Sequence, residues 1–223
     1  MDFKRQVGIF NPDKNKEFTV SVVGCGSVGS FTALALAKMG VNVAEVFDSD
    51  IVEEHNIPNQ FFKKEHVGRK KAGALEELLY EFAGVRTELY GNVDKNTKLE
   101  GLIVVSAVDS IEARKEIWES VKGSKPMLYI DSRMGGRIFS VYSVDMLDEA
   151  EVKVYDESLA KTGNGLEVPC TERSIIFNVL GLASIVCNQV VEFAAQRKLR
   201  RVIHFDYKNY TIMTPDWDGA THS

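Results

Sequence analysis

The chain has 223 residues, of which 44% are hydrophobic and 26% charged, ordinary proportions for a globular protein with a core large enough to need no disulfides or metals. Its net charge of −5 gives no broad electrostatic reason to expect nucleic acid or an anionic membrane as a partner. No apolar run has the length of a membrane span, and no signal-peptide core follows the charged start, so we expect a cytoplasmic protein. The cysteines are scattered without a Cys-x-x-Cys pair, so we expect neither a disulfide framework nor a structural zinc site.

A glycine turn follows the first predicted strand. Val20 to Val23 is a β-branched apolar run typical of a buried strand, and Gly24 to Gly29 has the spacing G-x-G-x-x-G at the start of a helix. In such a turn Gly24 permits the tight bend, Gly26 lets backbone N–H groups approach a phosphate, and Gly29 lets the helix pack closely on the sheet. The N-terminus of the helix then faces an anion.

A carboxylate follows the next strand. The helix at 30–39 is rich in helix formers, and the strand at 41–47 ends at Asp48, nineteen positions past Gly29, where a carboxylate can accept hydrogen bonds from the hydroxyls of a ribose. This context favours nucleotide binding over a purely structural glycine turn. By itself this context does not identify which nucleotide binds, and a redox cofactor is one of the alternatives.

The rest of the chain is predicted to complete one α/β domain over 1–223. Hydrophobic periodicity predicts helices at 68–82, 111–121 and 174–197, the last one continuous or broken near Gly181, strands at 85–90, 102–108, 127–130 and 138–144, and a hairpin at 202–212. Residues 1–17 are predicted to form an N-terminal arm and residues 147–170 a mobile crossover loop. The expected fold is a Rossmann-like mixed sheet, mostly parallel with antiparallel C-terminal strands, with helices on both faces.

Six short motifs occur in a fixed order along this framework. They are Arg5-Gln6, the turn Gly24 to Gly29, Asp48-Ser49-Asp50, Asn56-Ile57-Pro58-Asn59-Gln60, Gly68-Arg69-Lys70-Lys71, and Asp109 at the end of a strand. In order and spacing they resemble the ThiF/MoeB/HesA superfamily, the adenylating enzymes similar to the ubiquitin-activating enzyme. Several motifs in register are more specific than the glycine turn alone.

The resemblance implies that the ligand is ATP with magnesium. A C-terminal carboxylate would attack the α-phosphate, giving an acyl adenylate and pyrophosphate. Lys71 matches the family's essential lysine, and Asp109 matches its magnesium-binding acid, an oxygen ligand suited to that ion. Asp48 would hold the ribose, while Asp50 and Asn56 would shape the phosphate end or support the loop. The alternatives are an exposed helix-start charge at Lys71 and a helix cap at Asp109.

Arg5 and Asn59 stand at two positions where the family that this chain resembles has an arginine. Arg5 matches an arginine that crosses a dimer interface to the partner's triphosphate, which implies a homodimer; the alternative is a solvated terminal residue. Asn59 stands where the family has arginine, before Gln60 of the same predicted nucleotide-binding loop, and an amide brings no charge to a phosphate. Arg69, Arg133 or another cation is a possible substitute; alternatively, Arg133 forms a salt bridge with Asp131.

Cys170 lies just before the last long predicted helix, where family members carry the cysteine that accepts the acyl group as a thioester or acyl persulfide. A cysteine near a helix N-terminus has its thiolate favoured, which supports a nucleophile. The alternative is a partly buried small residue. The implied partner is a small ubiquitin-like or sulfur-carrier protein that ends in Gly-Gly.

Two other classes of function fit parts of the sequence. The glycine turn also suits an NAD-dependent oxidoreductase, although Lys71 and Asp109 together argue against it. The neutral Asn59 favours a superfamily member that binds nucleotide without catalysis and acts as a scaffold.

Overall fold

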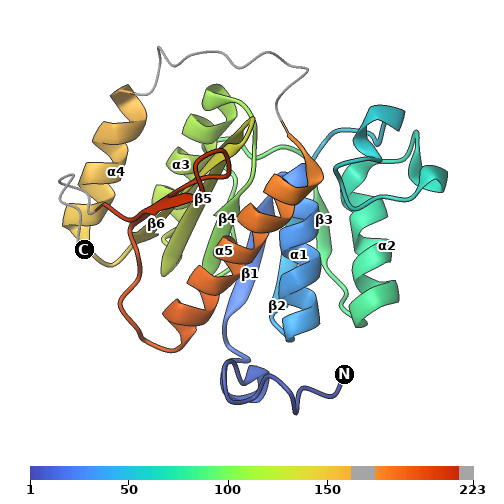
Figure 1. The fold of residues 1–223 in the computed structure, drawn as a ribbon, viewed down its shortest axis with the longest axis horizontal. Helices are drawn as coiled ribbons and strands as arrows, with labels where there is room; N and C mark the ends of the chain where they lie inside the picture. The colour runs from blue at the N-terminus through green and yellow to red at the C-terminus, as the bar shows by residue number, and fades with distance from the viewer. Residues whose placement is uncertain (162–173, 216–223) are drawn as a thin grey trace.

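The computed structural model describes residues 1–161 and 174–215, and its centre is an eight-stranded mixed sheet in the order β3-β2-β1-β4-β5-β6-β7-β8 (Figure 1). The strands are β1 Thr19–Val23, β2 Asn42–Phe47, β3 Glu88–Tyr90, β4 Ile103–Ser106, β5 Leu128–Gly135, β6 Ile138–Asp145, β7 Val202–Asp206 and β8 Thr211–Met213. Neighbours from β3 to β5 pair in parallel, and those from β5 to β8 pair antiparallel. The predicted mixed sheet with antiparallel C-terminal strands is confirmed.

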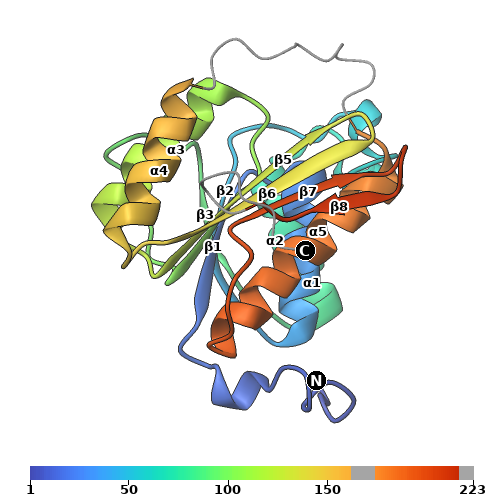
Figure 2. The same ribbon diagram turned by 60° about the vertical axis from the view of Figure 1, so that its left-hand side comes forward.

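Helices cover both faces of the sheet, as Figures 1 and 2 show. They are α1 Ser27–Met39, α2 Lys71–Ala83, α3 Ile111–Ser124, α4 Glu149–Lys161 and α5 Ile176–Ala194. One apolar core lies between the sheet and α1, α2 and α5, and a second lies between the sheet and α3 and α4. In β1, Val20 and Val22 face the first core while Val23 faces the second, and the polar Ser21 between them is also buried, so the strand is covered on both faces.

The last long helix is continuous. α5 runs through Gly181, so the predicted alternative of two helices broken there is wrong. A Cβ atom at Gly181 would overlap the hydroxyl of Tyr207, which explains the glycine as a close-packing position. In the described part of the chain only α5 has the length and apolar composition of a membrane span, and half of that window is buried inside the protein. A core helix shows the same composition.

The predicted loop at 147–170 is wrong over much of its length, because residues Glu149–Lys161 form α4. Asp148 caps this helix, accepting a hydrogen bond from the N–H of Ala150 at 2.9 Å. Tyr155 and Leu159 are the apolar side chains that α4 buries. With so few apolar residues the helical period is weak, although Asp148 before an acidic first turn is a helix-start signal that we missed. The remaining residues of the predicted loop, including Cys170, lie outside the described residues.

The N-terminal arm packs at the C-terminal end of α1. It consists of hydrogen-bonded turns and a short 3-10 helix, Pro12–Lys14. The side chain of Gln6 donates to the carbonyl oxygen of Met39 at 2.7 Å, and Phe10 is buried. Because α1 has 13 residues it is about 20 Å long, so the arm lies that far from the glycine turn at the other end of the helix.

Candidate nucleotide site

The glycine turn lies between the carboxyl end of β1 and the start of α1. Gly24 has φ +93°, and a Cβ atom there would lie 2.7 Å from the carbonyl oxygen of Ala107. A Cβ atom at Gly29 would overlap the carbonyl oxygen of Gly24. Gly26, by contrast, has no atom within 4 Å of its Cβ position. Two glycines are therefore needed by the turn itself, and Gly26 is the one with open space in front of it, as a bound phosphate requires.

Asp48 connects the glycine turn to the end of β2. One carboxylate oxygen accepts the N–H of Cys25 at 2.7 Å, and the other accepts the N–H of Asp50 at 2.8 Å. These bonds fix the carboxylate beside the turn, and each oxygen keeps a lone pair that can accept a ribose hydroxyl. Cys25 itself is completely buried. This burial raises the pKa of its thiol well above the usual value, so Cys25 is not a nucleophile.

Lys71 is a nearly buried cation in this region. It is the first residue of α2 and is only 8% exposed, so the alternative of an exposed helix-start charge is wrong. Its ammonium group lies 2.9 Å from a carboxylate oxygen of Asp50, and its backbone N–H donates to the carbonyl oxygen of Asp50 at 2.9 Å. The ion pair with Asp50 holds the ammonium group of Lys71 close to the glycine turn, which Asp48 also contacts.

In the loop at 51–62, the side-chain amides of Asn56 and Asn59 form hydrogen bonds to other residues of the chain. The side-chain oxygen of Asn56 accepts the N–H of Glu53 at 2.9 Å, so this buried residue supports the loop. The Asn59 amide donates to the hydroxyl of Ser174, 115 positions away, just before α5. The side-chain oxygens of Asn59 and Gln60 are buried without a hydrogen-bond partner among the described residues. Asn59 thus contacts the segment before α5 instead of projecting as a free group.

Asp109 follows β4 and is exposed. The cap of α3 is the next residue, since the hydroxyl of Ser110 accepts the N–H of Ala113 at 3.1 Å. Asp109 therefore does not serve as the cap. Because β2, β1 and β4 are adjacent and parallel, the turn, Asp48 and Asp109 meet at the same edge of the sheet.

One predicted site residue, Arg5, is not at this edge of the sheet. The N-terminal arm lies at the far end of α1 from the glycine turn (Figure 1). Arg5 is exposed in this arm and therefore does not reach the glycine turn of its own chain. Cys170 lies outside the described residues. Arg133 forms a salt bridge with Asp131, with 2.7 Å between its Nε and the carboxylate, so that alternative is confirmed. Sequence reasoning missed the other partners of Asp131, because they come from α3 and α4 and no sequence pattern pairs them.

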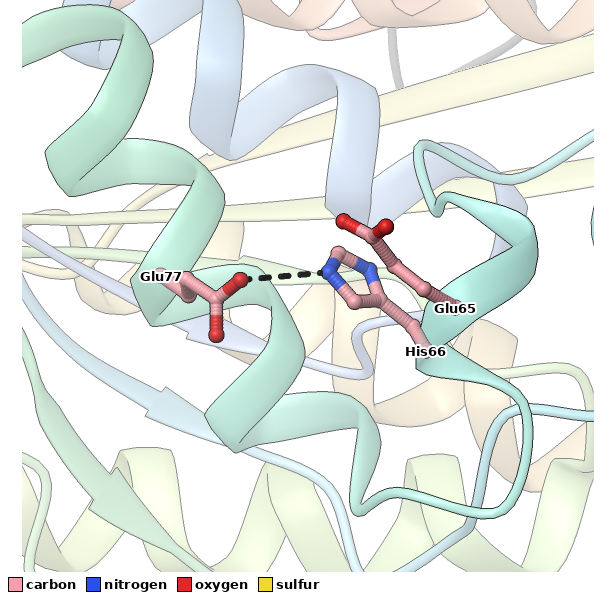
Figure 3. Close-up of side chains that lie close together, drawn as sticks. All are labelled: Glu65, His66 and Glu77. Atoms are coloured by element: carbon pink, nitrogen blue, oxygen red, sulfur yellow. Dashed lines mark ion pairs between the residues drawn. The ribbon is translucent and has the colours of Figure 1, made fainter.

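Glu65, His66 and Glu77 form the one group in the described residues with the composition of a metal site, and Figure 3 shows His66 pointing at Glu77. His66 is fully buried, and its Nε2 lies 3.4 Å from Glu77. Its Nδ1 accepts the backbone N–H of Lys63 at 3.3 Å, so the neutral ring carries its proton on Nε2. A metal needs a lone pair at that nitrogen. The hydrogen bond from Arg69 lowers the pKa of Glu77, which already serves as a partner of that cation.

We therefore expect the cluster of Glu65, His66 and Glu77 to bind no metal. A metal that binds only the folded state would raise the melting temperature of the purified protein, and a chelator that removed it would lower the melting temperature. We therefore expect neither zinc nor a chelator to change the melting temperature. Scanning calorimetry with and without each additive measures this. An upward shift with zinc that disappears in Glu77→Gln would contradict the assignment; Glu76→Gln is the matched control.

The fold and the edge of the sheet together define a class, the Rossmann-like proteins that hold a nucleotide at a glycine turn. Residues 4–222 match the ThiF family, and the chain belongs to this family of adenylating enzymes, which are similar to the ubiquitin-activating enzyme.

Relatives in sequence carry the name ubiquitin-like modifier-activating enzyme 5. The chain is 33% identical to the Xenopus laevis protein over 135 residues, which is 52% of this chain and 34% of that protein. It is 30% identical to the Dictyostelium discoideum protein over 132 residues, with 51% and 35% covered. The chain spans about a third of the length of these curated relatives.

Solved structures share the fold. The structure of Escherichia coli MccB with ATP matches with a TM-score of 0.70 and 16% identity, covering 92% of this chain and 66% of that one. PaaA matches with a TM-score of 0.69 and 18% identity, covering 90% and 73%. At these identities the likeness concerns the fold alone.

Proposed function

We propose that this chain catalyses ATP-dependent adenylation of the C-terminal carboxylate of a small protein or peptide. The observation that carries the proposal is Lys71, a cation 8% exposed and held by Asp50 beside a turn whose Gly26 faces open space. When a carboxylate attacks a phosphate two anions are brought together, so a fixed cation stabilises the charge of the transition state. A redox cofactor would not require that cation.

Each group at the edge of the sheet has a role in this proposal. The N–H groups of the turn and the N-terminus of α1 bind phosphate, Asp48 accepts the ribose hydroxyls, and Lys71 neutralises phosphate charge. The exposed carboxylate of Asp109 is a hard oxygen donor that fits magnesium, which would offset further phosphate charge when bound. The carboxylate forms a bond to the α-phosphorus as the bond to pyrophosphate breaks, so the products are an acyl adenylate and pyrophosphate.

The substrate class is suggested by the relatives. Two of them are named as activating enzymes for a ubiquitin-like modifier, and MccB has been solved with MccA. For this chain we propose a small ubiquitin-like or sulfur-carrier protein ending in Gly-Gly. Transfer of the acyl group from the adenylate to the Cys170 thiol, with release of AMP and formation of a thioester, stays a prediction. An acyl persulfide would form in the same way if a sulfur donor had first converted Cys170 to a persulfide. Exchange of labelled pyrophosphate into ATP, measured with and without a candidate carrier, tests the function; background exchange with every candidate would contradict it.

A second function is favoured by one observation. The neutral amide of Asn59 takes the place of a cation and is bound to Ser174. This arrangement suits a family member that binds ATP as a scaffold without catalysis. Such a protein would bind a non-hydrolysable ATP analogue and show no carrier-dependent exchange.

The predicted homodimer gives a complementation experiment. Arg5 lies about 20 Å from its own site, so we expect it to act at the site of a partner subunit. Arg5→Ala and Lys71→Ala should each be inactive, whereas an equal mixture should recover about a quarter of the wild-type exchange rate, because half the dimers are mixed and each mixed dimer holds one complete site. Exchange assays after subunit mixing measure this. An inactive mixture, or full activity of Arg5→Ala alone, would contradict the assignment.

A further inference from the structure

Two guanidinium groups share one buried carboxylate in the sheet. Asp131, in the middle of β5, is completely buried and pairs with Arg114 of α3 and with Arg133, two positions along the same strand. The hydroxyl of Tyr155 also donates to Asp131 at 2.8 Å. Among the described residues of this group two positive charges meet one negative charge, which leaves a net charge of +1. Buried charges are normally balanced, so the surplus favours an additional anion.

Neighbouring groups respond to the same positive charge. The pKa of Arg114 is lowered, mainly because the side chain is buried and further because Arg133 lies close. The pKa of His204 is also lowered, first by burial and then by the charge of Arg133. In both cases Arg133 lies close enough to act as a neighbouring positive charge.

Arg133 is the accessible member of the pair. Its side chain is 20% exposed, whereas that of Arg114 is 4% exposed. The guanidinium carbon lies over the Tyr142 ring, 4.4 Å from its centre, within the range of a cation–π contact. Among the described residues, Nε of Arg133 donates to the carboxylate of Asp131, and Nη2 donates to the hydroxyl of Tyr155. A guanidinium has five N–H donors, so this one keeps capacity for a planar anion.

The position of Arg133 in the sheet indicates which anion. Along the sheet edge the strand order is β2, β1, β4, β5, which places Asp48, the glycine turn, Asp109 and Arg133 in that sequence, with neighbouring strands about 4.8 Å apart. Arg114 also donates to the carbonyl oxygen of Val108 at 2.6 Å, directly before Asp109. Arg133 therefore lies beyond Asp109, on the side away from the ribose and the glycine turn.

We infer that Arg133 binds the C-terminal carboxylate of the substrate and positions it next to the α-phosphate. The inference rests on the proposed function, because it assigns the second substrate to the same site. If Asp48 held the ribose and the glycine turn the phosphates of ATP, the free side of the α-phosphate would face β4 and β5, and the attacking carboxylate would approach from there. A guanidinium is the side chain that binds a carboxylate with two parallel hydrogen bonds, and stacking on Tyr142 holds it in the orientation needed.

The test compares two peptides that differ only at the C-terminus. Both end in Gly-Gly, one with a free carboxylate and one with an amide, and both carry a fluorescent label for anisotropy with a non-hydrolysable ATP analogue bound. The wild-type protein should prefer the carboxylate by about tenfold or more, since hydrogen bonds to charged groups are the strong ones. In Arg133→Gln that preference should disappear, while affinity for the ATP analogue stays unchanged; Arg133→Lys should keep part of it.

The control is Arg137→Gln, which makes the same charge change at an exposed position in the next turn. It should retain the full preference for the carboxylate. If Arg133 only compensated Asp131, Arg133→Gln would lower the melting temperature and leave the preference intact, and that result would overturn the inference. A wild-type protein without preference would overturn it as well. Failure of the proposed function is a separate outcome, seen as loss of ATP-analogue binding or of carrier-dependent exchange in the wild type.

Discussion

Replacing Lys71 by methionine should lower carrier-dependent ATP–pyrophosphate exchange by at least about a hundredfold, the effect expected when one fixed donor to a transition-state charge is removed. Methionine keeps the apolar stem in this buried position and removes only the ammonium group. The partner carboxylate of Asp50 is 67% exposed, so it is solvated when the ammonium is absent. We therefore expect little change in the free energy of unfolding. Exchange kinetics and a thermal melt measure the two quantities.

The adjacent residue supplies the matched control. Lys70 is exposed, and its ammonium donates to the carbonyl oxygen of Ser49. Lys70→Met makes the same charge change one position earlier and should leave exchange near the wild-type rate. Equal losses in the two variants would mean that the net charge of the region matters and that the placement of Lys71 does not. Wild-type exchange in Lys71→Met would remove Lys71 from the mechanism.

The parts of the site that sequence could predict are those whose geometry is local. The turn from Gly24 to Gly29 and the acid at Asp48 follow from a strand, a helix and a second strand of fixed lengths, so spacing alone brings them together. The buried state of Lys71 was not predictable from spacing. It depends on the position of Asp50 after β2 and on the packing of α2, which no short-range pattern reports.

Contacts between distant segments account for most of what sequence reasoning left open. Asn59 and Ser174 are 115 positions apart, and Arg114 reaches Asp131 from a different element, the helix α3. Charged residues have no periodicity that distinguishes a buried partner from a solvated one. The helix α4 was missed for a related reason, since it buries few apolar side chains and the rest of its surface is polar.

The glycine turn itself gives the second large prediction, because two glycines in it have different reasons to lack a side chain. A Cβ atom at Gly29 would meet the backbone of Gly24, which cannot move aside without opening the turn. Gly29→Ala should therefore lower the free energy of unfolding by about 3 kcal/mol, the upper end of the usual overpacking cost. For a chain of this length that corresponds to a melting temperature lower by about 10 °C.

Gly26→Ala should behave in the opposite way. Its Cβ atom would enter open space, so the cost to the free protein is confined to the backbone, whose φ of −75° is open to alanine while its ψ of −148° lies outside the regular regions. The melting temperature of the free protein should therefore fall much less than in Gly29→Ala. The added methyl group would occupy the space into which a phosphate must fit, so the protein should lose measurable affinity for ATP in calorimetric titration. Unchanged ATP affinity in Gly26→Ala would show that the phosphates bind elsewhere. A folded, stable Gly29→Ala would show that the turn tolerates a backbone shift. Only the two variants together distinguish Gly29, which shapes the turn, from Gly26, which faces the ligand.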